Sequence, residues 1–274
     1  MEKINSQLGK DRNFLYFTVP VVILMAICSA IGIWKQNLYF RETIDWLAQC
    51  VGQDISNLFF VAPILLLSAL YATRGNKVAK IIWIGAMITN IYSYVIYCFA
   101  VHFNYLFLVY CIILGLSNFS VIYFFVNYLK EDFKSWFTEK VPTKTIGIFL
   151  IFISIMFASL WLSGDLPAVL KNNVPENIIE TGLITNTVHV LDYTFYLPLI
   201  FIAGFMLIKK KNLGYLLAPM IIVFAIITNV NIISLMVVAK YRNVPSDTGL
   251  IIGFGIFTII YCGFLWSMLR RLKK

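Results

Sequence analysis

The chain has 274 residues, of which 60% are hydrophobic and only 13% are charged, with a mean hydropathy of +0.83 and a formal net charge of +9. Soluble domains contain about 45–50% apolar and about 25% charged residues, so this composition excludes an ordinary soluble protein and indicates a polytopic membrane protein. No Gly/Ser/Pro-rich linker interrupts the chain, and we therefore expect one transmembrane domain over residues 1–274.

The first half of the chain predicts four transmembrane helices. Residues 1–13 are polar, and the apolar run 14–34 that follows is long enough to cross a hydrocarbon core of about 30 Å. Residues 35–56 form a mixed segment that we expect to lie as a helix in the membrane interface. The three further helices are predicted over 57–73, 81–101 and 105–129.

The second half predicts four more. A charged stretch, 130–144, separates the halves, and a long outer segment is expected over 163–188. The predicted helices are 146–162, 189–211, 213–239 and 249–269. The sixth contains Pro198 and ends in three lysines, which pin that end to the cytoplasmic face. The expected fold is thus an all-α bundle of eight transmembrane helices.

The distribution of basic residues predicts how the bundle is oriented. Of the 22 lysines and arginines, 17 fall at the termini and in the loops of one side, and 5 fall on the other. Cytoplasmic loops carry the excess of basic residues, so we expect both termini in the cytoplasm and the protein in the plasma (inner) membrane. The positive charge follows these loops, which argues against nucleic acid as a partner and leaves the lipid bilayer.

The two halves show similar patterns. Each has a first helix, a long outer segment, a proline-bearing second helix and a close helix pair. Aligning Asn57 with Asp192 also aligns Phe60 with Phe195 and Pro63 with Pro198. This pattern suggests a 4+4 duplication of residues 1–134 and 135–274. Because each half would cross the membrane an even number of times, the repeats would be parallel.

Polar residues concentrate in the extracytoplasmic half of the predicted bundle. One pair lies at the start of the second helix and another at the start of the sixth. The two members of each pair are three residues apart and therefore lie on the same face of their helix. A third pair occupies the turn between helices three and four, and a fourth lies in the outer half of helix seven. Ionisable groups inside a membrane are costly and suggest function, so these residues are our candidates for binding a ligand or ion. They are Asp54 and Asn57, His189 and Asp192, His102 and Asn104, and Asn229 and Asn231.

Each candidate also has a purely structural interpretation. Acids at a helix start complement the helix dipole, and asparagines in a membrane often join helices by hydrogen bonds. Asp192 is hardest to explain this way, because it lies one turn deeper than His189. We expect its carboxyl to face the bundle interior, within reach of His102, His189, Asn229 or Asn231.

Motifs for known chemistry are absent from the sequence. It has no HExxH, Walker A or GxSxG pattern, so we expect no metal site, no nucleotide-driven transport by this chain alone and no serine hydrolysis. A haem held by His102 and His189 is an alternative that we do not favour, and we expect no cofactor.

Three stretches of the sequence carry a resemblance to a known family. They are GQDISNLFFVAPILLLSALYATRG at 52–75, AVHFNYLFLVYCIILGLS at 100–117 and VHVLDYTFYLPL at 188–199. The chain resembles an uncharacterised family of bacterial and archaeal multi-span membrane proteins over about residues 51–238. That family implies no activity, but the three stretches contain several of the candidate polar residues.

Two classes of function follow from the candidates. In the first, the bundle is permease-like or binds a small molecule or cation in a polar pocket that opens to the extracytoplasmic side, with Asp54 and Asp192 as the binding acids. In the second, it is an enzyme acting on a lipid or isoprenoid at the outer leaflet, with His189 as the base and Asp192 orienting it. We favour the first, because no nucleophile or metal motif supports an enzyme. The ligand and the oligomeric state stay open.

Overall fold

A computed structural model describes the backbone of residues 2–273 and the side chains of residues 11–273. It confirms the prediction of an all-α membrane protein with eight helical spans, and no strand is found among the described residues. The spans are α1 (Glu2–Trp34), α2–η2–α3 (Ile44–Ser56, Asn57–Val61, Ala62–Ala72), α4 (Lys77–Phe99), α5 (Phe107–Tyr128), α6 (Thr143–Lys171), α8–η4–α9 (Thr187–Leu191, Asp192–Tyr196, Leu197–Ile208), α10 (Gly214–Tyr241) and α11 (Thr248–Leu269). Short helices lie between them: η1 (Gln36–Tyr39), η3 (Phe133–Trp136) and α7 (Glu176–Thr181).

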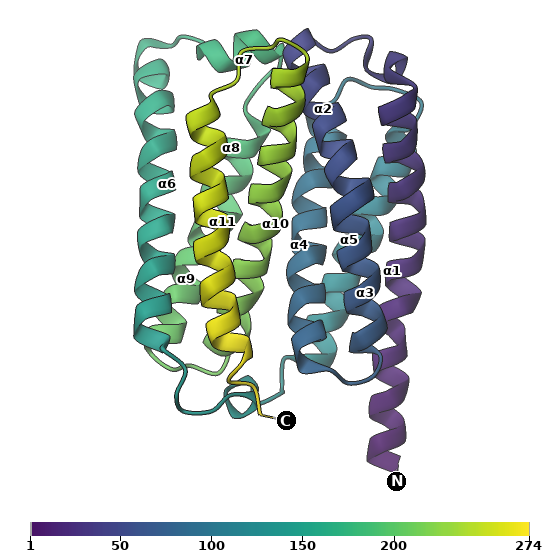
Figure 1. Ribbon diagram of the computed structural model, residues 1–274, viewed down its shortest axis with the longest axis vertical. Helices are drawn as coiled ribbons and strands as arrows, with labels where there is room; N and C mark the ends of the chain where they lie inside the picture. Colours follow the sequence, from purple (N-terminus) through teal and green to yellow (C-terminus); the bar gives the residue numbers. More distant parts are fainter. Residues whose placement is uncertain (1, 274) are drawn as a thin grey trace.

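The spans run along one long axis, and both ends of the chain lie at the same end of the bundle, opposite α7 (Figure 1). We call the end that holds α7 and the α10–α11 turn the outer end, following the predicted orientation. Of the eight spans, α4 is the most enclosed by protein, and it packs against α10 at the junction of the two halves. The remaining spans surround this central pair.

Glycines allow α10 to pack closely against the first half. A Cβ atom on Gly52 would lie 2.5 Å from Leu235 Cα, and one on Gly85 would lie 2.7 Å from Met220 O. These distances are too short for any side chain, so α2 and α4 approach the α10 backbone directly. Small residues at such crossings are how membrane helices gain packing energy, since hydrocarbon offers no hydrophobic driving force between them.

The prediction that residues 35–56 lie in the interface is wrong for most of the segment. After η1, the Thr43 side chain caps a new helix by accepting a hydrogen bond from Trp46 N, and this helix continues as a membrane span to Ala72. Its polar residues face protein: Asp54 and Ser56 are buried. A helix with polar residues facing protein has the same amphipathic pattern as a helix lying in the interface.

The expected outer segment 163–188 is also shorter than predicted. Helix α6 continues to Lys171 and ends in a left-handed Asn172, with φ of 51°. Helix α7 then crosses the outer end, and α8 begins at Thr187 after the Asn186 side chain accepts a hydrogen bond from His189 N. The true outer connection is therefore residues 172–186.

Two spans contain a π-turn at matching positions. Asn57–Val61 and Asp192–Tyr196 are both π-helical, and a proline follows each by two residues, at Pro63 and Pro198. A π-turn accommodates one extra residue within a helix and often marks a functional site. The coincidence agrees with the alignment of Asn57 with Asp192, but the 4+4 duplication itself stays a prediction.

Candidate functional site

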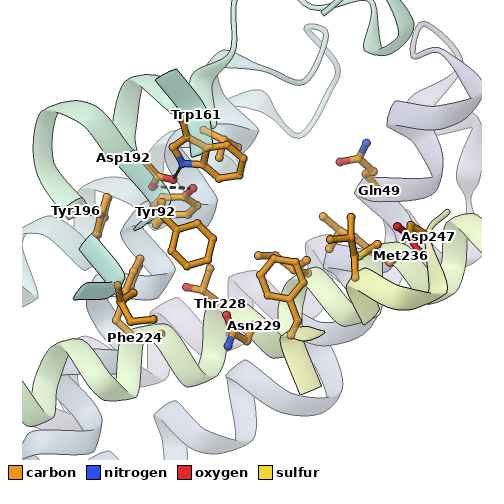
Figure 2. A pocket seen from close by; sticks show the side chains of 18 of the residues that line it. Gln49, Tyr92, Trp161, Asp192, Tyr196, Phe224, Thr228, Asn229, Met236 and Asp247 are labelled. Atoms are coloured by element: carbon orange, nitrogen blue, oxygen red, sulfur yellow. Dashed lines mark hydrogen bonds between the residues drawn. The ribbon is translucent and has the colours of Figure 1, made fainter. Parts of the chain in front are cut away.

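A cavity of about 490 Å³ lies between α6, the α8–η4–α9 span, α10 and α11. Asp192, Trp161, Tyr92 and Tyr196 lie at one end, and Gln49, Met236 and Asp247 lie at the other (Figure 2). The second group comes from the outer part of α2, the outer part of α10 and the α10–α11 turn, so the cavity extends from the outer end into the second half of the bundle. Its size is typical of a site for a small molecule.

Asp192 is the acid of the inner part of the cavity. Its carboxylate accepts a hydrogen bond from Trp161 Nε1 at 2.9 Å and one from the Tyr92 hydroxyl at 3.3 Å. The dashed lines in Figure 2 show these two bonds converging on the carboxylate. Asp192 therefore faces the cavity. Its direct hydrogen-bond partners are Trp161 and Tyr92, and none of the four residues expected from the sequence bonds to it directly.

The π-turn determines where Asp192 lies. Asp192 is its first residue, directly after the single turn of α8, and Pro198 follows near the start of α9. Proline has no amide hydrogen to bond to the preceding turn, which weakens the regular ladder at that point. The irregular backbone places Asp192 and Tyr196 on the side of the span that faces α4 and α10, where both line the cavity.

Aromatic rings cover much of the cavity wall around Asp192. The rings of Tyr196 and Phe224 stack at 4.6 Å between centroids, and the ring of Tyr92 meets Tyr196 edge-on at 4.8 Å. Phe157 and Trp161 of α6 continue this surface. The carboxylate therefore lies among rings from four different spans.

Two polar side chains of α10 lack hydrogen-bond partners. Thr228 Oγ1 and Asn229 Nδ2 are both buried and bond to no other group among the described residues. Both residues line the cavity, and Asn229 as a whole is 7% exposed. A buried polar group without a partner costs free energy, so such groups favour a ligand or water that can bond to them.

His189 lies just outside this cavity. Its Nδ1 is 2.7 Å from Asp165 Oδ2, which also accepts a hydrogen bond from the Tyr193 hydroxyl at 2.9 Å. Its ring stacks on Trp161 with 4.5 Å between centroids. His189 and Trp161 line a second hollow of about 290 Å³ beneath α7. Trp161 therefore lines both pockets and contacts both residues, whereas Asp192 and His189 lie in different pockets.

Asp54 occupies a closed site in the first half. It is 2% exposed and accepts hydrogen bonds from the hydroxyls of Tyr39 at 2.6 Å and Tyr97 at 2.8 Å. Burial raises the pKa of Tyr39 well above its usual value, so this hydroxyl stays a donor to Asp54. The Asp54 carboxylate is therefore satisfied by protein groups, and it does not line the cavity.

The other predicted residues make structural contacts. Asn57 accepts a hydrogen bond from Gln53 Nε2 at 2.8 Å, and Asn231 accepts one from the Ser56 hydroxyl at 2.6 Å. At the outer turn, His102 Nδ1 lies 2.8 Å from Glu42 Oε2, and Asn104 accepts from Leu106 N at 2.9 Å. Of the eight candidates, the structure brings only Asp192 and Asn229 into the cavity.

Sequence reasoning missed several residues of the site. Trp161 and Tyr92 lie in apolar runs where nothing distinguishes them from packing residues. A polar side chain that sits mid-helix is the one signal that could have indicated Thr228. The contact of Tyr92 with Asp192 spans 100 positions of sequence, and no local pattern encodes it.

Comparison with protein-family models, curated proteins and solved structures found no match. The resemblance to an uncharacterised membrane-protein family therefore stays a prediction. No group of three or more His, Cys, Asp or Glu side chains suited to a metal ion occurs among the described residues. The site must be interpreted from its own geometry.

Proposed function

We propose that the protein is a permease-like or ligand-binding bundle that takes up a small molecule in the cavity beside Asp192. The observation that carries this proposal is a cavity of about 490 Å³ that is lined by the half-buried Asp192 and by two polar residues of α10, Thr228 and Asn229. A carboxylate and two polar side chains within a largely apolar lining are the few placed polar groups that orient a small molecule in such a site. Asp54 does not line this cavity, and its carboxylate already has two tyrosine donors.

We further propose that the cavity opens to the extracytoplasmic side of the plasma membrane. Its lining reaches the α10–α11 turn through Pro245, Ser246 and Asp247, at the end of the bundle opposite both chain ends. The excess of basic residues at the chain ends favours a cytoplasmic position for that end. Together these two facts support access from outside the cell.

A second candidate function is catalysis at the outer leaflet, and the His189–Asp165 pair favours it. A histidine held by a carboxylate is a common arrangement for a general base. The orienting acid would be Asp165, in place of the Asp192 expected from the sequence, because Asp165 makes the 2.7 Å contact with the ring. Replacing His189 with Gln would then abolish turnover without affecting occupancy of the cavity, which separates the two functions.

Outward access to the cavity can be tested by cysteine labelling in intact cells. Thr228 lies 13 residues before the outer end of α10, about 20 Å along the helix. We expect a Thr228→Cys variant to react with a membrane-impermeant methanethiosulfonate reagent added outside the cell. The neighbouring Ile227 is 1% exposed and does not line the cavity, so Ile227→Cys is a matched control that should stay unlabelled.

The unmodified protein measures the background from its five cysteines, of which Cys111 and Cys262 are exposed. Labelling of Thr228→Cys only after the membrane is permeabilised would contradict outward access. Equal labelling of the two variants would show that the reagent detects local unfolding rather than a cavity.

A further inference from the structure

The charged residues that line the cavity are all acidic. Its lining contains three carboxylates and no lysine, arginine or histidine among the described residues. Asp192 lies at the inner part, and Asp45 and Asp247 lie toward the outer end. A cleft lined by one sign of charge with low-dielectric walls concentrates ligands of the opposite sign.

Each of these carboxylates is held by neutral groups. Asp192 accepts from the Trp161 ring and the Tyr92 hydroxyl, Asp45 accepts from Gln49 Nε2 at 3.2 Å, and Asp247 accepts from Gly249 N at 2.6 Å. Donors of this kind stabilise the charged form of a carboxylate without cancelling its charge. The cavity therefore has no internal counter-ion that a ligand would first have to displace.

The aromatic wall adds a second attraction for positive charge. Tyr92, Trp161 and Tyr196 all line the cavity close to Asp192. A cation within about 6 Å of a ring centroid is attracted by the negative face of the ring, and cages of aromatic side chains bind quaternary ammonium groups in this way. Rings also favour the apolar body of an organic ligand over bulk water.

A bare metal ion fits this cavity poorly. Ca²⁺ requires six to eight oxygen ligands, and Mg²⁺ requires near-octahedral oxygen coordination. The lining offers one carboxylate in its inner part, surrounded by rings and aliphatic side chains such as Ile200 and Ile153. An organic cation needs no such shell, because methyl or methylene groups already cover its charge.

We propose that the ligand of the cavity is an organic monocation, with an ammonium group against Asp192 and an apolar body against the rings and aliphatic side chains. The polar residues Thr228 and Asn229 line the same cavity and would lie beside a polar substituent of that body. This inference rests on the proposed function, because it identifies the chemical class of ligand for the same cavity.

Binding of three matched probes to the purified full chain tests the ligand class. The probes are 4-phenylbutyltrimethylammonium, the neutral 4-phenylbutan-1-ol and the anionic 4-phenylbutyrate, which share one apolar body and differ in charge. Calorimetric titration should give at least about a tenfold lower Kd for the cation than for the alcohol, and the weakest binding for the carboxylate. This comparison requires no variant. Equal affinity for the three probes, or no binding of the cation, would overturn the proposal.

Variants then locate the effect. Asp192→Asn should remove the preference for the cation while keeping the affinity for the alcohol. Asp54→Asn is the matched control, since it makes the same change at a buried acid of the first half that does not line the cavity, and it should keep the preference. Loss of the preference in both variants, or in neither, would contradict the role assigned to Asp192.

A third variant separates failure of the inference from failure of the proposed function. Thr228→Trp fills the cavity and should abolish binding of the cation and the alcohol alike, and Ile232→Trp provides a second blocking position. If all three probes bind equally and the blocking variants prevent it, the ligand class is wrong and the cavity is still the site. If the probes bind equally well to blocked protein that keeps its unfolding midpoint, the cavity is not the site, and the proposed function fails.

Discussion

Asp54 lies shortly before one π-turn and Asp192 begins the other, one in each half, but the two acids have different surroundings. Asp54 bonds to two tyrosine hydroxyls and is sealed by packing, whereas Asp192 bonds to a tyrosine and a tryptophan and faces an open cavity. The difference comes from the neighbours rather than from the acids. A buried acid in a membrane helix therefore identifies a functional candidate only when the space beside it is also known.

The bonds to Asp192 predict how its replacement affects stability. Asp192→Leu should lower the free energy of unfolding by about 1–3 kcal/mol, because it leaves the Trp161 ring nitrogen and the Tyr92 hydroxyl without an acceptor. Asp192→Asn keeps one acceptor oxygen and should cost less than about 1 kcal/mol. Unfolding titrations in mixed micelles measure both values. Equal losses for the two variants would mean that the carboxylate does not hold these donors.

The sequence predicted Asp192 and Asn229 as site residues but not what surrounds them. Their polarity within apolar helices is a local property, and a single sequence displays it. The partners Trp161 and Tyr92 come from α6 and α4 and meet Asp192 only when the spans pack. Glu42, which bonds to His102, was likewise not predicted. It lies in a polar connection between helices, where an acidic side chain is common and does not indicate a contact.

At the scale of elements, hydropathy predicted the eight spans, and local capping decided their limits. The interface helix expected over 35–56 was wrong because amphipathicity does not tell whether the polar side faces protein or lipid headgroups. The π-turns could not be predicted either, since proline weakens a helix without determining how the chain adapts.

The π-turn at Asp192–Tyr196 predicts unusual tolerance to deletion. Removing Phe195, whose side chain is 66% exposed, should convert the turn to regular α-helix without changing the register of the flanking helix. Removing Phe201 from the regular part of α9 shifts the packing face of every residue beyond it by about 100°. The Phe195 deletion should therefore yield folded protein, and the Phe201 deletion should not.

Yield of monodisperse protein by size-exclusion chromatography compares the two deletions. Because the π-turn places Asp192, the Phe195 deletion should fold and yet lose binding of the cationic probe. Similar yields for both deletions would indicate that the extra residue of the π-turn has no structural role.

At the scale of the whole molecule, the count of basic residues predicts the topology. A fluorescent reporter fused after Lys274 should be active because it stays in the cytoplasm, and one fused after Lys171, between α6 and α7, should be silent. An alkaline phosphatase reporter at the same two positions should give the opposite pattern. An active fluorescent reporter at Lys171 would reverse the orientation and place the cavity mouth in the cytoplasm.

Helix α11 is the thinnest wall of the cavity. Only Tyr261 and Met268 are buried in it, whereas Ile252, Ile256 and Ile259 are exposed on its outer surface. In a bilayer those exposed side chains meet acyl chains, so a single helix separates the fatty interior of the membrane from the space beside Asp192. Lipid tails and detergent chains are thus natural competitors for the apolar part of the cavity. Ligand affinities measured in alkyl detergents should therefore depend on the length of the detergent chain. Affinities measured in bilayer nanodiscs should correspond to those in the cell membrane.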